Sequence, residues 1–385
     1  MLLIRRTTPV LALAGLALLS ACGGSSSSGG GGSGPIRIGM AVGLSGYLAS
    51  VDKPVVEGAE IAVGRINASG GVLGRQLELK VQDMASDPAK GVTVTNQLIN
   101  SDKAGVLLNG FTSAATAAET PVATRAKVPI IAASILPADP SWVFSTIPPN
   151  RYTAQTALGY AKKSGARTVG ILFSQTPFGE QAAKTLATEA GAQGLQVVGS
   201  ETADAAATNL TPQVSKLAGA DVIVDAVTGP AQVVLAQNAK TLGYKGSLLL
   251  NIDSTGVFQR ASEAYPKTLF VAAPPQVYPQ VADAQVKSAN DAFVPAYKQK
   301  NADNSGVAYA GRGYDAVYIA AEAMKASGAT TGDKLLKALE GVKYDGTSAV
   351  YAFSPDDHNG YKANPYVLAR FVQPGKIEVA YAPGG

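Results

Sequence analysis

The 385-residue sequence contains one cysteine, Cys22, and one histidine, His358. A single cysteine excludes a disulfide framework, so the stability of the fold must come from packing. His358 has no second histidine or cysteine nearby, which excludes a usual zinc site, and the turn-rich loop around it predicts an exposed side chain. The sequence therefore indicates no metal site and no cofactor.

Charged residues are scarce as well, at 16% of the chain, and 32 basic against 28 acidic residues leave a formal charge of +4. Because no basic tract and no stripe of basic and aromatic residues occurs, we expect no nucleic-acid partner. Beyond the first 22 residues, no apolar run is long enough to cross a membrane.

Sequence patterns of catalysis are missing too. The chain has no Gly-x-Ser-x-Gly elbow, no phosphate-binding P-loop and no dinucleotide fingerprint. Residues 50–53 fit the Ser-x-x-Lys spacing of penicillin-interacting enzymes, but the accompanying Ser-Asp-Asn and Lys-Thr-Gly elements do not occur. We therefore expect no catalytic residues and no enzyme activity.

The N-terminus carries the features of an export signal. Arg5 and Arg6 precede a short apolar run over residues 9–21, which ends in small residues directly before Cys22. This order predicts a lipoprotein signal over residues 1–22, with Cys22 as the lipidated first residue of the mature chain. Residues 23–35 are almost entirely Gly and Ser and predict a flexible tether. The alternative is an ordinary cleaved signal that leaves Cys22 as a free thiol.

The rest of the chain has the composition of a well-packed globular protein. Hydrophobic residues make up 46% of the sequence, and 42 glycines indicate many tight turns between short elements. More than 350 residues follow Cys22, a length that favours two domains.

From residue 36 onward, apolar strands alternate with amphipathic helices. Pro54 is expected in the first turn of its helix, and Asp87 caps the helix that opens with Pro88. Such alternation implies a mostly parallel sheet with helices on both faces. The alternation starts again near residue 168, which indicates two halves with the same order of strands and helices. Strands are expected at residues 36–42, 77–81, 106–108, 129–133, 168–173, 195–199, 222–227 and 247–250, and helices at residues 54–69, 86–99, 113–126, 179–190, 212–217 and 230–242.

The last third of the chain breaks this alternation. Two long helices are expected at residues 282–300 and 314–326, with a shorter helix at residues 334–339. A final strand pair is expected near residues 350–353 and 366–371. If these last helices return to the first half, the chain crosses between the halves several times, which suits a hinge.

Several stretches resemble a known family. Residues 58–88, which include Gly58-Ala59-Glu60, Gly74-Arg75 and Asp87-Pro88, resemble the extracellular amino-acid-binding lipoproteins of branched-chain amino-acid ABC transporters. Shorter stretches follow in the family's order at residues 44–46, 110–116, 178–179 and 313–316, which read LSG, GFTSAAT, FG and GYDA. The resemblance spans essentially residues 36–372.

The resemblance implies an α/β fold of the periplasmic binding protein type I, with two lobes, each a mostly parallel sheet covered by helices, and a ligand cleft at the hinge. It implies an N-terminal lobe of residues 36–152 plus 276–345 and a C-terminal lobe of residues 153–275 plus 346–385. It also implies a monomeric, lipid-anchored extracytoplasmic protein of an ABC importer. Such a protein binds a branched-chain or related small amino acid and delivers it to a membrane permease.

The family's positions also imply a ligand site. Ser113 matches the serine that binds the α-carboxylate, and Ser134 matches the backbone site at the exit of the next strand. A helix start independently favours an anion, although Ser113 is equally consistent with a plain helix cap. Asp253 is the nearest carboxylate to the family's ammonium-binding acid, or alternatively a solvated loop residue.

Further contacts are implied by position. Phe178 stands where the family has an aromatic that covers the ligand, and Thr228 stands at a second contact. Tyr47 and Val51 follow the first strand and are expected to line the side-chain pocket, unless they belong to the core. Leu136 stands where the family commonly has a threonine that holds the ligand. Because leucine offers no hydrogen bond, either the backbone compensates, Leu136 is a packing residue, or the ligand is an amide, an aromatic acid or another small carboxylate.

Two other classes of function remain open at this point. A sensor would use the same cleft but pass its closed shape to a signalling partner, and a permease and an ATPase encoded beside the chain would favour transport. An enzyme is disfavoured by the missing catalytic patterns, and steady turnover of a bound compound would be needed to support it.

Overall fold

The computed structural model describes residues 34–383 except for residues 205 and 303. Cys22, the predicted export signal and nearly all of the predicted tether lie outside the described residues. Among the helices that are described, none combines the length and the apolar character that a membrane crossing requires.

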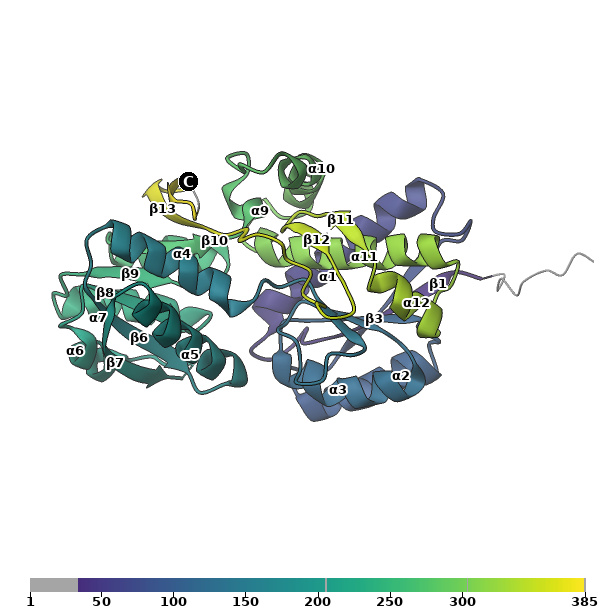
Figure 1. Ribbon diagram of the computed structural model, residues 1–385, viewed down its shortest axis with the longest axis horizontal. Helices are drawn as coiled ribbons and strands as arrows, with labels where there is room; N and C mark the ends of the chain where they lie inside the picture. The colour runs from purple at the N-terminus through teal and green to yellow at the C-terminus, as the bar shows by residue number, and fades with distance from the viewer. Residues whose placement is uncertain (1–33, 205, 303, 384–385) are drawn as a thin grey trace, which may run out of the picture. The chain divides into compact units, whose positions relative to one another are not determined.

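The first sheet contains five parallel strands in the order β2-β1-β3-β4-β5. Ile38 and Met40 of β1 pack with helices α1 and α11 on one face, whereas Ala41 packs with Leu98 of α2 on the other. These elements are β1 (Ile36–Val42), β2 (Leu77–Asp83), β3 (Val106–Asn109), β4 (Ile130–Ala132), β5 (Val143–Ser145), α1 (Ala49–Ala68), α2 (Pro88–Asn100), α3 (Ser113–Ala126) and α11 (Val307–Ser327). Figure 1 shows α2 and α3 side by side along this sheet.

The second sheet contains seven strands in the order β14-β13-β10-β9-β8-β6-β7. Strands β6 to β10 are parallel, and β13 and β14 continue the sheet antiparallel. Helices α4 and α5 cover one face, and α6, α7 and α8 cover the other. The elements are β6 (Thr168–Ser174), β7 (Gln196–Ala203), β8 (Val222–Ala226), β9 (Ser247–Leu250), β10 (Thr268–Ala272), β13 (Val367–Gln373), β14 (Lys376–Tyr381), α4 (Asn150–Lys163), α5 (Pro177–Ala192), α6 (Thr211–Leu217), α7 (Pro230–Thr241) and α8 (Thr255–Ala264).

A third, two-stranded sheet pairs β11 (Lys343–Asp345) with β12 (Val350–Ala352). The Tyr351 hydroxyl of β12 donates to Asp315 Oδ2 of α11 at 3.1 Å, so β12 is tied to a helix of the first lobe. The remaining helices are α9 (Pro274–Val277), α10 (Ala284–Lys300) and α12 (Gly332–Leu339). The predicted lobe boundary at residue 345 stays a prediction, and it falls inside this strand pair.

The predicted two-lobed α/β architecture is confirmed, but several elements differ. Helix α1 begins at Ala49, so Pro54 lies inside the helix rather than in its first turn. The strands near residues 350–353 and 366–371 do not pair with each other, because β12 pairs with β11 and β13 with β10 and β14. Strands β5, β10, β11 and β14 and helices α4, α8 and α9 were not anticipated.

The predicted exposure of His358 is wrong. Its side chain is only 6% exposed, and its ring stacks on Phe144 of β5 with 4.1 Å between the centroids. Nδ1 lies 2.9 Å from the carbonyl oxygen of Pro140. Turn-forming residues predict a loop, but they do not show whether the loop packs against a strand. In the structure this loop packs against β5.

The most extensive helix packing in the first lobe is between α1 and α11 (Figure 1). A Cβ atom added to Gly58 would overlap the carbonyl oxygen of Ala310, and one added to Gly313 would overlap the carbonyl oxygen of Val55. Both glycines belong to the stretches that carry the family resemblance. Their lack of a side chain is what allows the two helix backbones to approach each other.

We expect Gly58→Ala to lower the free energy of unfolding by about 2 kcal/mol, because its methyl group forces α1 and α11 apart. Gly64→Ala in the same helix is the matched control. No heavy atom lies within 4 Å of a Cβ built there, so alanine gains helix propensity and is neutral or stabilising by up to about 1 kcal/mol. Urea unfolding of the two variants measures the difference, and equal stabilities would contradict this account of the packing.

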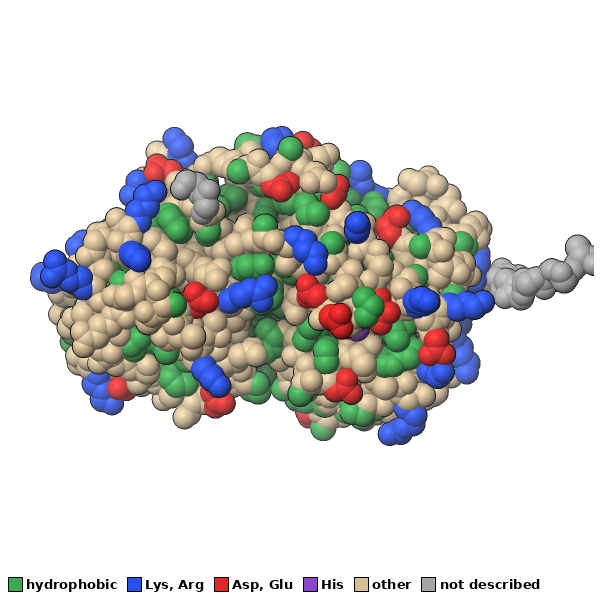
Figure 2. All heavy atoms as spheres, viewed as in Figure 1, with side chains coloured by type: hydrophobic (Ala, Val, Ile, Leu, Met, Phe, Trp, Pro, Cys, Tyr) green, Lys and Arg blue, Asp and Glu red, His purple; other side chains and the backbone are tan. Residues whose placement is uncertain are grey.

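The surface carries no large area of one charge on the face that Figure 2 shows, where basic and acidic side chains are interspersed. The ion pairs among the described residues are mostly exposed, such as Lys127 with Asp333 at 2.7 Å and Arg370 with Glu378 at 2.8 Å. Exposed pairs contribute little to stability, so the hydrophobic clusters of the two lobes stabilise the fold.

Candidate functional site

A cleft of about 700 Å³ lies where loops from both large sheets meet. From the first sheet, Tyr47 follows β1 and Phe111 follows β3, and from the second sheet, Ser174 ends β6 and Thr228 follows β8. A smaller cavity of about 140 Å³ shares these four residues and adds Ser113 and other residues of the same loops. The two spaces together are called the cleft below. Open α/β sheets bind ligands at the carboxyl ends of their strands, and the cleft lies at that end of both sheets.

Four helices begin at the cleft. The N-cap residues of α1, α3, α5 and α7, which are Leu48, Thr112, Thr176 and Gly229, all line it. The first turn of a helix has unpaired N–H groups and a partial positive charge, so these four helix ends favour an anionic group in the cleft.

Local sequence explains why the helices of the second lobe start here. The Thr176 hydroxyl accepts a hydrogen bond from the N–H of Gly179 at 3.2 Å, and Pro177 occupies the first helical position. Gly229 has a φ of 71°, a conformation that favours glycine, and Pro230 follows it at the start of α7.

A buried aspartate holds the cleft loops of the first lobe. Asp52 of α1 is fully buried, and its carboxylate accepts from the N–H of Gly43 at 2.8 Å and from the N–H of Phe111 at 2.7 Å. Burial raises the pKa of Asp52 to about 6, and the two backbone hydrogen bonds act in the opposite direction. Asp52 therefore joins the loop after β1 to the loop after β3, although the sequence marked it only as part of a Ser-x-x-Lys match.

Asp253 has the corresponding position in the second lobe. Its carboxylate accepts from the N–H of Gly229 at 2.5 Å and from its neighbour, the N–H of Ser254, at 2.6 Å. The residue is 2% exposed, and burial raises its pKa. The buried Tyr309 hydroxyl lies beside this carboxylate without a well-aligned hydrogen bond. Asp253 thus lies directly behind the wall that Gly229 forms, rather than in the wall itself.

Most of the other predicted site residues line the cleft. Ser113, Phe178, Thr228, Tyr47 and Val51 all do so, and Tyr47 is 70% exposed. Ser113 is the first helical residue of α3 and not its cap, and within the described part of the chain its hydroxyl has no hydrogen-bond partner. The plain-cap alternative for Ser113 is therefore wrong.

Two predicted residues lie elsewhere. Ser134 is 1% exposed, and its hydroxyl lies 2.9 Å from the hydroxyl of Thr116 in α3. Leu136 is half-buried against the hydrophobic cluster that includes Leu98 and Ile130. Neither residue is part of the cleft lining, and the position of Leu136 agrees with the packing alternative.

Sequence reasoning missed several lining residues. Phe111, Ser174 and Thr176 lie in the wall: Ser174 is the last residue of β6, and Phe111 and Thr176 lie in loops between a strand end and a helix start. That position is the signal that would have identified them. Among the described lining residues, Asp204 is the one with a charged side chain, and it is exposed.

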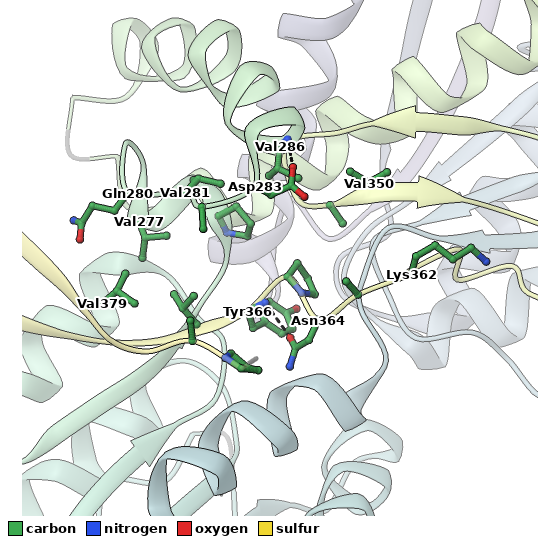
Figure 3. Close-up of a pocket in the computed structure, with 18 residues that line it drawn as sticks. Val277, Gln280, Val281, Asp283, Val286, Val350, Lys362, Asn364, Tyr366 and Val379 are labelled. Carbon is green, nitrogen blue, oxygen red and sulfur yellow. Dashed lines mark hydrogen bonds between the residues drawn. The ribbon is translucent and has the colours of Figure 1, made fainter. Parts of the chain in front are cut away.

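A second cavity of about 360 Å³ lies beside α9 and α10 and is mostly apolar. Figure 3 shows valines from three parts of the chain around it, with Asn364 and Tyr366 on one side. The N–H of Tyr366 donates to the Asn364 side-chain oxygen at 3.0 Å. Two helices, α9 and α10, begin beside this cavity, whereas four helices begin at the cleft.

Residues 35–376 match the family described as periplasmic binding protein. The leucine-, isoleucine-, valine-, threonine- and alanine-binding protein of Pseudomonas aeruginosa is 26% identical to this chain over 323 residues, which cover 80% of this chain and 83% of that protein. The Leu/Ile/Val-binding protein homolog 7 of Brucella abortus is 25% identical over 368 residues, or 91% of this chain and 92% of that protein.

Solved structures with the same architecture cover nearly all of the described chain. The protein Rp1789 of Rhodopseudomonas palustris aligns with a TM-score of 0.82 and 25% identity over 90% of this chain and 99% of that chain. The branched-chain amino acid transporter substrate-binding protein LivJ of Streptococcus pneumoniae, solved in complex with isoleucine, aligns with a TM-score of 0.75 and 24% identity over 90% and 98% of the two chains.

Proposed function

The chain belongs to the periplasmic binding protein family, and from that premise we propose that it binds an amino acid or a related small carboxylic acid in the cleft and delivers it to an ABC permease. Members of this family bind solutes outside the cytoplasm and are not enzymes. The relatives named for leucine, isoleucine and valine support an amino acid as the first ligand class to test.

The single observation that carries this proposal is the cleft itself. Its wall combines two loops of the first sheet with loops of the second, and four helices begin at its edge. A ligand that contacts both lobes stabilises the arrangement in which they approach each other, which is the physical basis for capture and release without chemistry. We place the ligand carboxylate at the start of α3 near Ser113, with Phe178, Thr228, Tyr47 and Val51 around the remainder.

Three further statements are part of the proposal. Cys22 anchors the mature chain to the membrane through lipid, and residues 23–35 act as its tether. The protein works as a monomer. The chain crosses between the lobes for the last time after β12, near residues 362–366, because β12 is paired with β11 and bonded to α11.

A thermal-shift screen of the purified chain across amino acids, their amides and aromatic acids tests the proposal. One compound, or a set of close analogues, is expected to raise the melting temperature, since a ligand at 100 times its Kd stabilises the folded state by about 2.7 kcal/mol. The same compound is recovered unchanged after incubation with the protein. If no amino acid, amide or small acid shifts the melting temperature, the proposal is wrong, and steady conversion of a bound compound would point to an enzyme instead.

A further inference from the structure

The structure contains a buried arginine that has no counter-ion among the described residues. Arg312 of α11 is 1% exposed, and the described residues form no ion pair with it. Its Nη2 lies 3.5 Å from the Tyr366 hydroxyl oxygen, a long contact, and its buried Nη1 has no hydrogen-bond partner in the part of the chain that the structure describes. A guanidinium group carries a full positive charge, and here that charge lies inside the protein.

The arginine lies behind the wall of the cleft. Its Cζ atom is 5.4 Å from the ring centroid of Phe111 and 5.5 Å from that of Tyr309. Phe111 lines the cleft between the end of β3 and the start of α3, and its ring contacts that of Tyr309 edge-on at 5.3 Å. Aromatic faces attract a guanidinium, but they do not replace a negative charge.

The nearby buried carboxylates do not serve as its partner. Asp52 accepts from two backbone N–H groups of the first lobe, and Asp253 accepts from two of the second. Asp315 of the same helix accepts from the N–H groups of Thr347 and Ser348 instead. A buried charge without a partner is costly, and such groups persist where the protein uses them.

We propose that Arg312 is a specificity-determining residue that makes the cleft select a carboxylate over the corresponding neutral amide. This proposal rests on the proposed function and narrows its ligand class. A carboxylate held at the start of α3 lies next to Phe111, and therefore close to the unpaired charge behind that ring. The helix ends supply hydrogen-bond donors that both an acid and an amide can use, whereas the full charge of Arg312 distinguishes the two.

The size of the effect follows from Coulomb's law. For a carboxylate about 8–10 Å from the guanidinium, at an effective dielectric constant of about 20, the attraction corresponds to about a 20-fold gain in affinity. A neutral amide gains almost nothing at that distance. The ratio of the two affinities, rather than either affinity alone, is therefore the signature of Arg312.

Isothermal titration with the acid identified by the screen and with its primary amide tests this inference. For an amino-acid ligand the pair is the amino acid and its amide, which share the α-amino group and differ in the charge of the carboxylate. In the wild type the acid binds more tightly. Arg312→Leu lowers the affinity for the acid by about 20-fold and leaves that for the amide within about twofold, while Arg312→Lys retains most of the preference.

Arg151→Leu is the matched control, because Arg151 also lies over a tyrosine ring, 4.6 Å from the centroid of Tyr152, but is exposed. It is expected to leave the acid-to-amide ratio unchanged. Equal loss of acid and amide in Arg312→Leu would assign Arg312 a purely structural role and overturn the inference. An amide that binds the wild type as tightly as the acid would also overturn it but leave the proposed function intact, whereas a lack of binding by every compound would overturn the proposed function.

Folding of the variants is not an obstacle to this test. Replacing an unpaired buried charge with an apolar side chain is expected to keep or raise the melting temperature of the ligand-free protein. If Arg312→Leu does not fold, Arg312→Met takes its place as the variant that removes the charge, with Arg312→Lys as the variant that keeps it. An acid-to-amide ratio that is unchanged in Arg312→Met would contradict the role given to the guanidinium.

Discussion

Replacing Asp52 with alanine is expected to lower the free energy of unfolding by about 3 kcal/mol and to weaken ligand binding by at least about 100-fold. The carboxylate is the acceptor for the N–H groups of Gly43 and Phe111, and both groups are left without a partner when it is removed. These bonds hold the two loops that form the first lobe's side of the cleft. The loss of binding therefore exceeds what the loss of stability alone explains.

The matched control for this prediction is Asp283→Ala. The Asp283 carboxylate also accepts from two N–H groups, those of Gln285 and Val286, but it caps α10 on the surface beside the second cavity. We expect a loss of about 1 kcal/mol from the missing cap and no change in affinity. Urea unfolding and calorimetric titration measure both quantities, and normal affinity in Asp52→Ala would contradict the role of Asp52 in shaping the cleft.

Asp253→Ala is expected to lower the free energy of unfolding by about 2–3 kcal/mol and to weaken ligand binding by about 100-fold. The variant leaves the N–H groups of Gly229 and Ser254 unpaired and releases the loop that carries Thr228. The sequence predicted a different role, in which Asp253 contacts the ligand ammonium. That role stays a prediction, and the two roles differ in what they imply for ligands without an amine.

A pair of ligands separates the two roles of Asp253. If the carboxylate positions Gly229, Asp253→Ala lowers the affinity for an amino acid and the affinity for its deaminated analogue by the same factor. If the carboxylate contacts an ammonium, the variant lowers the affinity for the amino acid much more than the affinity for the analogue. We expect equal losses, because the carboxylate is 2% exposed and already accepts from two N–H groups. A loss confined to amine-bearing ligands would contradict the positioning role.

Much of the fold could be predicted from local sequence. The apolar runs that became β1, β6, β8 and β9 have their predicted positions to within about one residue, since a buried parallel strand is a short continuous apolar run. Strand β5 is only three residues long, and its apolar residues do not stand out from the loop around them. Helix α4 was missed because Asn150 at its start and the polar residues that follow give a weak apolar pattern.

The site residues that could be predicted are those whose place in the cleft follows from their position after a strand. Ser113, Phe178 and Thr228 follow strand ends, and strand ends of a parallel sheet meet at one edge. Asp253 also follows a strand, but whether its carboxylate faces the cleft or the backbone behind it depends on the fold of the loop at Gly229. Arg312 was not predictable, because it lies in a helix far from the cleft loops in sequence and reaches Phe111 only through tertiary packing.

The most direct test of the account is a crystal structure of the protein with the compound that gives the largest thermal shift. We expect electron density for that compound in the cleft, with its anionic group at the start of α3 and its body between Phe111 and Thr228. Density for the compound in the second cavity beside Tyr366, with an empty cleft, would contradict it.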